Sequence, residues 1–542
     1  MVLPQTATPA TTNATPAVQT FARSRVGDVF IQLLVFFGGV TSVGTEIAAS
    51  RLVAPYFGSS TFIWANLIGL TLTYLSLGYW LGGKVADRYP RAWLLYTLTA
   101  IAAIWAGLIP YLSRPILSAS LRAFDQLAVG AFYGSLVGVL LLFLVPITLL
   151  GFVTPYAIRL RLADVHRAGN VAGNTYALST VGSILGSFLP VLVLIPWIGT
   201  TRTFLVLALL LLVPSLLGLI RLRAVPQATI AAALGVALAM LPLVADFSVV
   251  RPAERGRLVY ETESAENYIQ VLEEDGRMLL ALNDGHAIHS IYDPDELLTG
   301  GPWDYFMVGP LFNQGAGVAS VDRALLIGLA GGTVAHQLTA AYGPIPIDGV
   351  EIDPEIVRVG RDYFAMDEAH LPNLNAVVAD GRYFLRTTEM TYDLIGVDAY
   401  RQPYIPFQLT TKEFFGEVSN QLSPEGVAVI NAGKTDTDFR LVDVIASTMK
   451  SVFPNVYLID VDRFDNTIIV GTKTPADLNT FAQSVEGLPD GSVLRRVGES
   501  SLASGNIREQ TTSETVFTDD HAPVERVVDQ IILDAAREES NP

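Results

Sequence analysis

The sequence predicts a multi-domain protein in which an N-terminal bundle of transmembrane α-helices precedes a C-terminal α/β Rossmann-like domain. Three observations predict this fold class. Long apolar runs fill residues 29–250, strand and helix patterns alternate over residues 291–542, and a small N-terminal β-region at residues 251–290 precedes that alternation. The charge also changes sign along the chain, because residues 1–250 hold 14 Lys+Arg and 6 Asp+Glu, whereas the remaining residues hold 21 and 46.

The composition of the 542-residue chain narrows the classes of function. Hydrophobic residues make up 51% and charged residues 16%, against a usual charged share of about 25%, which indicates a surface that faces lipid. An acidic C-terminal half does not favour DNA or RNA, because nucleic-acid binding needs Lys and Arg. That acidic half either attracts a cationic substrate or only keeps the domain soluble. The absence of cysteine excludes disulfides, thiolate metal sites and a cysteine nucleophile.

Residues 1–28 are predicted to form a disordered tail, because Thr, Ala and Pro are abundant in its first 20 positions. Seven apolar runs follow in the predicted transmembrane domain, residues 29–250, and each is near the roughly 20 residues that a helix needs to cross a bilayer. Only helices satisfy their own backbone hydrogen bonds there. The small residues of Gly182–Ser187 predict close packing of one such helix against another. The runs are Phe30–Val53, Phe62–Gly83, Trp93–Leu112, Val129–Val153, Leu178–Trp197, Phe204–Ile220 and Thr229–Ala245.

The Lys and Arg residues between the runs predict the orientation of these helices. Alternate segments, which hold Arg23 and Arg25, Lys84–Arg91, Arg159–Arg167 and Arg221–Arg223, share one side, and we expect that side to be cytoplasmic. Seven complete crossings would then put the acidic domain outside, whereas a cofactor made in the cytosol favours the inside. We expect a multi-pass protein of the cell membrane with a cytoplasmic soluble domain, in which one run is re-entrant or miscounted.

The C-terminal half begins with two or three strands over Arg257–Asp284, where Asp275-Gly276 predicts a hairpin turn. Strands and helices alternate after residue 291, which is typical of a mostly parallel sheet with helices on both faces. The predicted strands are Ala324–Gly328, Ile347–Ile352, Ala376–Val378, Leu394–Val397 and Val427–Asn431, and the predicted helices include Val334–Ala341 and Thr411–Leu422.

Ligands of an open α/β sheet bind beyond the carboxyl ends of the strands, so the residues at those ends are candidates for a site. The first strand ends in a glycine turn, which lets the backbone approach a ligand. The second ends in an acid about 20 residues further on, a position that commonly holds ribose hydroxyls. The next two strands each end in a carboxylate. In strand order these residues are Gly328, Gly331 and Gly332, then Glu351, then Asp380 and Gly381, and then Asp398 and Tyr400.

Each of these carboxylates has a second explanation, because acids also favour the N-terminal ends of helices. Asp353 precedes Pro354 and is interpreted as a helix cap. Glu351 and Asp398 stand at strand ends, where an acid that faces a cleft caps no helix, and we interpret them as functional.

Several stretches carry a resemblance to a known family. Four of them, the glycine turn, Val350–Pro354, Asp380–Leu385 and Tyr392–Asp398, resemble the polyamine aminopropyltransferases, the spermidine synthases. Others resemble bacterial proteins described as a major-facilitator-like segment fused to a spermidine synthase, and these are Glu46–Arg51, Ala54–Gly58, Trp64, Gly78–Arg88 and Phe517–Pro523. The similarity to this fused family spans nearly the whole chain, and it implies a class I methyltransferase-like fold for the Rossmann-like domain.

The resemblance implies that the protein is a transferase of polyamine biosynthesis. In that family an aminopropyl group moves from decarboxylated S-adenosylmethionine, the co-substrate, to an amine such as putrescine, and methylthioadenosine leaves. It implies Asp398 as the base that takes a proton from the amine. Glu351 would hold the ribose of the donor, Asp380 and Gly381 would lie beside its adenine, and the glycine turn would let it approach. The substrate side would hold Asn267, Asp284, Tyr305 and Tyr400.

Three features depart from the family pattern, one of which is Tyr305-Phe306 where the family has a Tyr-His pair before the glycine turn. The glycine turn of the family carries an Asp that grips the amine of the donor, whereas this chain has Leu329-Ala330 and a turn one residue shorter. Arg401 stands where the family has a second Asp beyond the base. Two other functions therefore stay open, an S-adenosylmethionine-dependent methyltransferase on the same scaffold and a polyamine transport or sensing protein.

We expect no metal ion, because His286 and His289 lie in a strand or loop context without a further cluster of ligands. The expected partners are a small amine such as putrescine and the lipid bilayer, and no nucleic acid. A homodimer through the soluble domain stays open.

Overall fold

The structure is a computed structural model, and two compact units make up the chain. It describes residues 25–539 except 58–60, 125–129, 163–164, 245–252, 254, 284–286, 401–403, 462–463 and 504–505. The first unit contains Met1–Val53, Phe62–Arg122 and Phe132–Val250, and the second contains Arg251–Pro542. Arg401, Asp284 and His286 lie outside the described residues.

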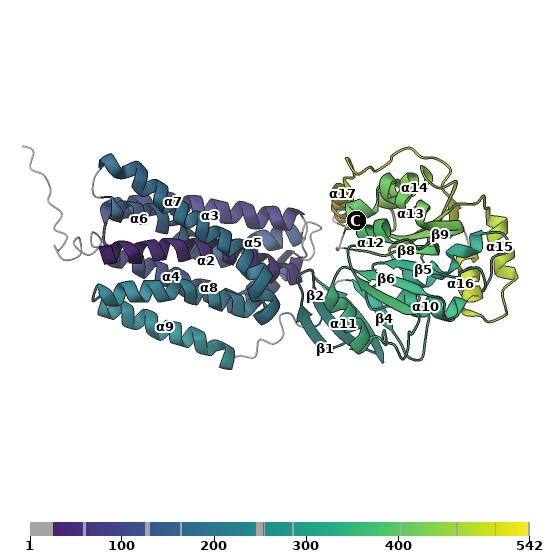
Figure 1. The fold of residues 1–542 in the computed structure, drawn as a ribbon, viewed down its shortest axis with the longest axis horizontal. Helices are drawn as coiled ribbons and strands as arrows, with labels where there is room; N and C mark the ends of the chain where they lie inside the picture. The colour runs from purple at the N-terminus through teal and green to yellow at the C-terminus, as the bar shows by residue number, and fades with distance from the viewer. Residues whose placement is uncertain are drawn as a thin grey trace, which may run out of the picture. The chain divides into compact units, whose positions relative to one another are not determined.

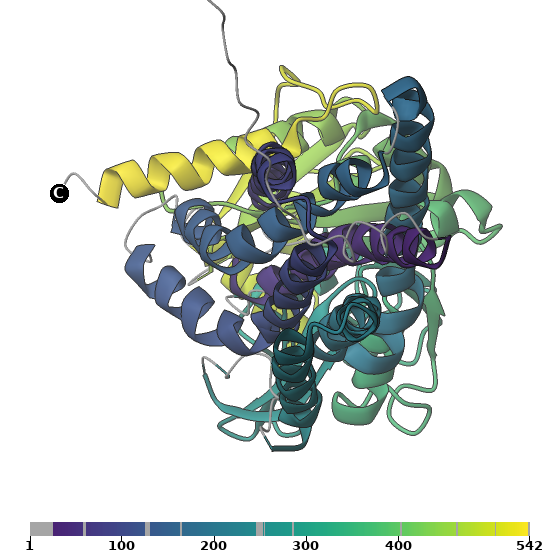
Figure 2. The same ribbon diagram turned by 90° about the vertical axis from the view of Figure 1, so that its left-hand side faces the viewer.

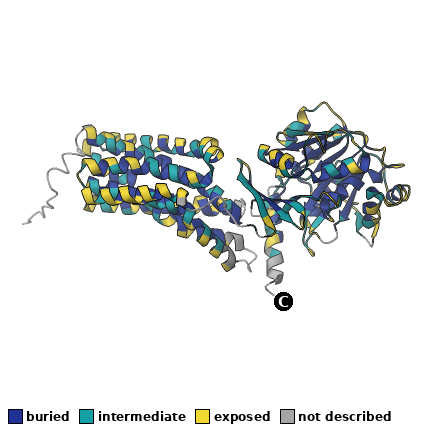
Figure 3. Cartoon of the chain, turned by 90° about the horizontal axis from the view of Figure 1, so that it is seen from below, coloured by how far each residue is buried: buried dark blue, intermediate teal, exposed yellow. Residues whose placement is uncertain are grey.

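The first unit is a bundle of α-helices, which Figure 1 shows from the side and Figure 2 from one end. Figure 3 shows buried residues between the helices and exposed residues on the outside, and many of the exposed ones, such as Leu192 and Trp197, are large and apolar. So many exposed large apolar side chains are unusual for a protein in water and suit contact with lipid. The helices are α2 (Arg25–Phe57), α3 (Thr61–Arg88), α4 (Ala92–Phe124), α5 (Gly130–Gly151), α6 (Val153–Arg161), α7 (Ala168–Leu189), α8 (Ile195–Arg221) and α9 (Val225–Val244). A π-helical segment, Pro190–Leu194, connects α7 and α8.

Five helical stretches among the described residues are long and apolar enough to cross a membrane, judged by length and composition alone. One of them, Val165–Arg221, has 57 residues and covers two of the seven predicted runs. Helix α3, which contains the predicted run Phe62–Gly83, is not among the five. The number of crossings and the bounds of the domains therefore stay predictions. The five stretches are Val26–Phe57, Ala92–Ser120, Tyr133–Arg161, Val165–Arg221 and Val225–Leu243.

Glycines let α2 and α7 pack with their backbones in contact. A Cβ atom at Gly182 would lie 2.1 Å from the carbonyl oxygen of Phe36, and a Cβ atom at Gly39 would lie 2.3 Å from that of Ser179. Side chains do not fit at such distances, because protein interiors are already close-packed. The close packing predicted at Gly182–Ser187 is therefore confirmed.

We expect Gly182→Ala to lower the thermal stability of the helical unit, because the added methyl group forces α2 and α7 apart. Overpacking of this kind costs about 1–3 kcal/mol. Gly173→Ala on the same helix is the matched control, since no atom lies within 4 Å of the position that its Cβ would take. Thermal unfolding of the purified chain in detergent, followed by far-UV circular dichroism, compares the two variants. Equal melting curves would contradict the close contact of α2 with α7.

The second unit opens with a four-stranded antiparallel sheet in the order β1-β2-β3-β4. Asp275 and Gly276 have φ values of 52° and 82° and form the turn between β2 and β3. Positive φ at both central residues defines the type I′ turn that matches the twist of a hairpin, so the predicted hairpin is confirmed. The strands are β1 (Arg257–Glu263), β2 (Tyr268–Glu274), β3 (Arg277–Leu282) and β4 (Ile288–Tyr292).

A second sheet of eight strands, in the order β12-β10-β11-β9-β8-β5-β6-β7, forms the centre of this unit. Strands β5 to β9 are parallel, and β11 is antiparallel to both β9 and β10. The chain runs outward from β5 to β6 and β7, then returns to β8 on the other side of β5. The strands are β5 (Ala324–Ile327), β6 (Ile347–Glu351), β7 (Leu374–Val378), β8 (Tyr392–Val397), β9 (Leu422–Gly433), β10 (Asn455–Asp460), β11 (Asn466–Thr472) and β12 (Ile507–Glu509).

This strand order creates a switch point between β5 and β8, where ligands of α/β sheets bind. Helices connect the strands, which confirms the predicted Rossmann-like fold. They include α10 (Thr333–Tyr342), α11 (Pro354–Tyr363), α12 (Gly381–Thr387), α13 (Lys412–Gln421), α14 (Arg440–Lys450), α15 (Leu478–Glu486), α16 (Val493–Leu502) and α17 (Val524–Glu539), together with a 3₁₀ segment, η3 (Pro302–Phe312).

Both faces of the large sheet are buried, and strand β5 shows why its sequence is apolar throughout. Ala324 and Leu326 belong to the hydrophobic cluster on one face, whereas Leu325 and Ile327 belong to the cluster on the other. Side chains alternate along a strand, so a strand covered on both faces is typically a nearly continuous apolar run. Central strands such as β5 and β8 are accordingly mostly buried, the class drawn in dark blue in Figure 3, whereas the edge strand β7 has no buried residue.

Candidate active site

A tight glycine turn leaves the carboxyl end of β5. Gly328, Ala330 and Gly332 have φ values of 88°, 48° and 83°, a region that glycine enters without strain. A Cβ atom at Gly328 would lie 2.4 Å from the main-chain oxygen of Asp398. The turn after β5 and the residue after β8 are therefore in direct contact at the switch point.

The Asp398 carboxylate is half-buried and held by two neighbours. Asn431, on β9, donates a hydrogen bond from Nδ2 to Oδ1 of Asp398 at 3.0 Å. Trp303, on η3, donates a second hydrogen bond to the same carboxylate. Burial raises the pKa of Asp398 to about 6, although both hydrogen bonds act in the opposite direction. A carboxylate with this pKa can accept a proton near neutral pH.

Tyr400 lies beside Asp398 and shares a partner with it. Its hydroxyl donates to the main-chain oxygen of Asn431 at 3.1 Å. Burial raises the pKa of the Tyr400 phenol, and the neighbouring Asp398 carboxylate raises it further. The phenol therefore stays neutral, and Tyr400 and Asp398, both predicted for this site, lie together.

Glu351 ends β6 beneath the glycine turn and is buried. One of its carboxylate oxygens, Oε2, accepts from the main-chain nitrogen of Ala330 at 3.0 Å, and the other accepts from that of Asp353 at 3.2 Å. Burial raises the pKa of Glu351 to about 7, and the hydrogen bonds from the backbone limit that rise. A carboxylate with this pKa is about half protonated at neutral pH.

The end of β7 contributes Asp380 and Gly381. Asp380 is exposed and caps α12, because its Oδ1 accepts from the main-chain nitrogen of Tyr383 at 2.8 Å. A Cβ atom at Gly381 would lie 2.3 Å from Cγ2 of Ile327, so only glycine lets α12 approach β5 here. The cap gives Asp380 a structural role, and its contact with the adenine of a donor stays a prediction.

The comparisons with known proteins agree with this geometry. A family profile described as "Spermine/spermidine synthase domain" matches residues 315–470. The second unit contains a spermine/spermidine synthase domain. The resemblance seen in the sequence is thereby confirmed for these residues, and we call the part of the second unit that is built on the eight-stranded sheet the synthase domain.

Curated relatives of the synthase domain bear transferase names. A "Probable polyamine aminopropyl transferase" of Bifidobacterium longum (strain NCC 2705) is 33% identical over 298 residues, 52% of this chain and 65% of that protein. A "Polyamine aminopropyltransferase" of Vibrio vulnificus (strain CMCP6) is 34% identical over 154 residues, 28% of this chain and 48% of that protein. The chain thus spans at most 65% of the length of these relatives.

Solved structures include a probable spermidine synthase from Corynebacterium glutamicum ATCC 13032. It has a TM-score of 0.37 and 21% sequence identity, and the match covers 45% of this chain and 95% of that one.

A further predicted residue, Asn267, hydrogen-bonds the side chains of Asp353 and Asn283. Asn267 donates from Nδ2 to Oδ2 of Asp353 at 2.9 Å, and Asn283 donates to Oδ1 of Asn267 at 3.0 Å. Asp353 also caps α11 by accepting from the main-chain nitrogen of Glu355, as predicted. The side-chain amide of Asn267 therefore links the small sheet to the synthase domain, and its substrate role stays a prediction.

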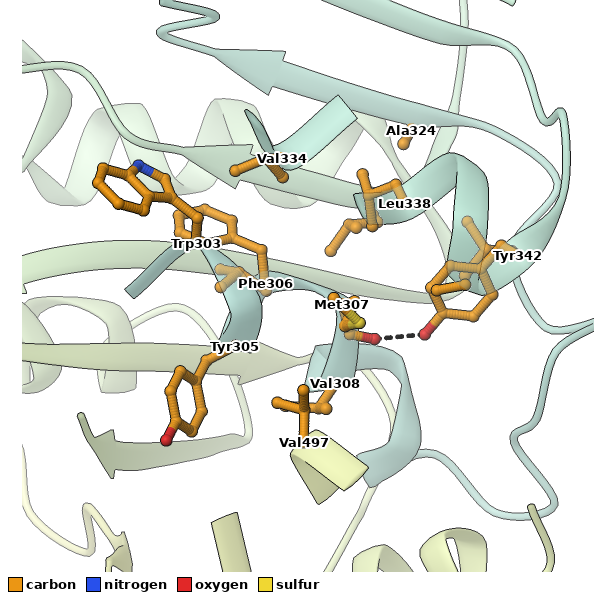
Figure 4. Close-up of a cluster of buried hydrophobic side chains, with 14 of the residues drawn as sticks. Trp303, Tyr305, Phe306, Met307, Val308, Ala324, Val334, Leu338, Tyr342 and Val497 are labelled. Carbon is orange, nitrogen blue, oxygen red and sulfur yellow. Dashed lines mark hydrogen bonds between the residues drawn. The ribbon is translucent and has the colours of Figure 1, made fainter. Parts of the chain in front are cut away.

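Tyr305 lies on η3 in the buried cluster that Figure 4 shows, close to Trp303 and Phe306. The Met307 main-chain oxygen accepts a hydrogen bond from Tyr342, which fixes η3 against α10. This cluster holds Trp303 in place behind Asp398. Only 5% of the surface of Tyr305 is exposed. Its substrate role stays a prediction.

A buried arginine joins the synthase domain to the motif near the C-terminus. Arg382, on α12, bonds Oδ1 of Asp519 at 2.7 Å and Oε2 of Glu417, on α13, at 2.9 Å. It also donates to the main-chain oxygen of Gln408 at 3.0 Å. Thr411 donates to Asp519 as well, at 2.7 Å. This network brings Asp380–Leu385 and Phe517–Pro523, two of the stretches that carry a resemblance, into contact with each other.

Among the described residues, no group of three or more His, Asp or Glu side chains is arranged to hold a metal ion.

Proposed function

We propose that the chain is a membrane-bound polyamine aminopropyltransferase. It would transfer an aminopropyl group from decarboxylated S-adenosylmethionine to putrescine or a related amine and release methylthioadenosine. The observation that carries this proposal is the Asp398 carboxylate, with its pKa near 6, on a residue whose main chain touches the glycine turn at the switch point of the sheet. The names of the curated relatives support the same reaction.

In the proposed reaction the amine nitrogen attacks the carbon next to the sulfonium sulfur. The new N–C bond forms with the nitrogen lone pair, the C–S bond breaks, and its electron pair neutralises the sulfur. An alkylamine is mostly protonated near pH 7, so Asp398 takes one proton before or during attack. The carboxylate also attracts the cationic substrates to this edge of the sheet.

The residues of the glycine turn and the next two strand ends fit a nucleoside. Glu351 lies under the turn with its carboxylate at the end of β6, where a ribose diol would meet it. Ile352 and Val378, at the ends of β6 and β7, are 52% and 49% exposed although both are apolar. Apolar groups exposed beside Asp380 suit the flat face of an adenine.

We expect Glu351→Gln to raise the KM for the donor about tenfold or more, because hydrogen bonds to a charged group contribute about 1.5–3 kcal/mol. The wild-type KM should fall as the pH rises through about 7, since Glu351 then loses its proton and accepts from both ribose hydroxyls. The variant has no such titration. Donor KM measured from pH 6 to pH 8.5 tests this, and an identical pH dependence in both proteins would contradict it.

A product assay tests the proposed function. The full chain, purified in detergent, is incubated with putrescine and either decarboxylated or ordinary S-adenosylmethionine, and the products are identified by mass spectrometry. Methylthioadenosine together with spermidine would support aminopropyl transfer. Neither methylthioadenosine nor S-adenosylhomocysteine with several amines would overturn the proposal and favour transport or sensing.

A methyltransferase on the same scaffold is the second candidate, and the glycine turn favours it. Leu329 and Ala330 stand where an acid would select a donor that lacks a carboxylate. Neither residue has a carboxylate that could bind the amine of the donor, and the Leu329 side chain is also buried. S-adenosylhomocysteine formed from ordinary S-adenosylmethionine in the same assay would establish this alternative.

We further propose that the helical unit makes the chain a multi-pass protein of the cell membrane, with the synthase domain in the cytoplasm. The five apolar stretches support insertion. The chain has no cysteine, so a single cysteine introduced at the exposed Asp490 reports the side of the membrane cleanly. Labelling of intact cells with a membrane-impermeant maleimide should leave it unmodified, and labelling before lysis would place the synthase domain outside.

A further inference from the structure

Three polar side chains form a line across three adjacent strands, ending at Asp398. Asn466 is the first residue of β11 and donates from Nδ2 to Oδ1 of Asn431, on β9, at 2.9 Å. Asn431 in turn donates from Nδ2 to Oδ1 of Asp398, after β8, at 3.0 Å. The strands β11, β9 and β8 are neighbours in the sheet, and Asn466 pairs in register with Gly433.

The direction of these hydrogen bonds decides the electrostatics at Asp398. A side-chain amide has an acceptor end and a donor end, and only the donor end stabilises a carboxylate. Asn466 donates to the acceptor end of Asn431, and the NH₂ group of Asn431 faces Asp398. Without that contact the amide could turn and place its oxygen against the carboxylate. Asn431 is buried, so the site has little water to compensate.

The other groups around Asp398 do not contact the side-chain oxygen of Asn431 in the hydrogen bonds described below, so these bonds do not orient its amide. Tyr400 is the titratable neighbour on its own strand end, and it donates to the main-chain oxygen of Asn431. From η3, Trp303 donates to the carboxylate. Further along from Asn431, the Lys434 ammonium group lies over the ring of Phe439. Across the glycine turn, the Glu351 carboxylate is bonded to Ala330 and Asp353.

We propose that Asn466 is a positioning residue for the base, because it fixes the Asn431 amide so that Asp398 is held in its ionised, proton-accepting form. The role in catalysis rests on the proposed function, whereas the effect on Asp398 does not. Asn466 contacts Asn431 and acts on Asp398 only through it. Its side chain belongs to a strand that the sequence pattern did not connect with the site.

The catalytic test follows the pH dependence of kcat/KM in Asn466→Ala and Asn466→Asp. We expect the acid limb to move upward by about one pH unit, the shift that corresponds to losing one hydrogen bond to a charged group. Activity should fall at pH 6–7 and recover at higher pH. Asn466→Asp is nearly isosteric, so it folds if Asn466→Ala does not, and it forces the Asn431 amide to turn. Asn455→Asp, at the start of β10, is the control for an added charge and should leave the limb in place.

A second measurement needs no activity. The thermal midpoint of the full chain in detergent is followed from pH 5 to pH 8 with and without Asp398→Asn, in the wild-type and Asn466→Ala backgrounds. In each background, the difference in thermal midpoint between the proteins with and without Asp398→Asn isolates the titration of Asp398. We expect the midpoint of that titration to lie about one pH unit higher in the Asn466→Ala background. Coincident titrations would overturn the inference. If the wild type forms no product at any pH, the proposed function has failed, and this comparison alone decides the role of Asn466.

Discussion

Asp398→Asn is expected to lower kcat/KM for aminopropyl transfer by about 10²- to 10⁴-fold, the range that a general base contributes. The asparagine has the size of the aspartate and can still accept a hydrogen bond from Asn431, so the site keeps its geometry. It cannot take a proton from the amine. The acid limb near pH 6 should also disappear, because burial sets the pKa of Asp398 to about 6 and the limb reports its ionisation. Initial rates of methylthioadenosine release from pH 5 to pH 9 measure both effects.

Asp393→Asn is the matched control on the same strand. The Asp393 carboxylate accepts from the main-chain nitrogen of Asp322 at 2.8 Å and from the Ser423 hydroxyl at 2.6 Å, at the opposite end of β8. Its loss should reduce stability and leave the acid limb in place. If Asp398→Asn retained the wild-type rate and limb, another group would be the base, and the proposed mechanism would be wrong.

The strand-end rule located much of the candidate site from the sequence alone. Glycine turns and acids that follow apolar strands are local features, and the parallel topology brings them to one edge whatever the details of packing. Gly328 and Asp398 are accordingly in contact in the structure. The rule was applied to four strands, but Asn431 ends the fifth predicted strand, so the same signal could have found it.

Other partners of Asp398 could not be predicted from local patterns. Trp303 reaches the carboxylate from a 3₁₀ segment, and Asn466 acts through the register between β9 and β11. Such contacts depend on how distant strands pair, and one sequence does not encode that register in any short motif. The predicted helix cap at Asp353 is confirmed because its contact is local, with a main-chain nitrogen only two residues away.

The antiparallel side of the large sheet was also missed. Strands β10 and β11 pair as a hairpin, but the connecting residues Val461–Asp465 contain no glycine, proline or asparagine that would mark a turn. Strand β9 begins at Leu422, whereas the sequence predicts its start at Val427. The prediction is late because Pro424 and Gly426 are typical of a turn. Turn-forming residues inside β9 therefore shift its predicted start. The lack of such residues between β10 and β11 leaves that hairpin unpredicted.

Arg382→Ala is expected to destabilise the synthase domain by about 3–5 kcal/mol, the usual cost of removing one partner from a buried ion-pair network. Only 7% of the Arg382 side chain is exposed, and its guanidinium group bonds Glu417, Asp519 and the main chain of Gln408. Asp519 would lose its bonded cation, whereas Glu417 would keep only its 2.7 Å pair with Arg386, whose side chain is 54% exposed. Hydrogen exchange of the full chain, followed by mass spectrometry on peptides from α12 and α13, measures the loss of protection.

Two variants separate this network from an ordinary surface charge. Arg358→Ala removes a cation that is 44% exposed and ion-paired with Glu355 and Asp362, and exposed pairs contribute about 1 kcal/mol or less. Arg382→Lys keeps the charge but loses the planar group that bonds two carboxylates at once, so its effect should lie between the two. Because α12 begins at Asp380 and Gly381, a loosened helix should also raise the KM for the donor more than it lowers kcat. Equal protection in Arg382→Ala and Arg358→Ala would show that the motif near the C-terminus does not stabilise the donor side of the site.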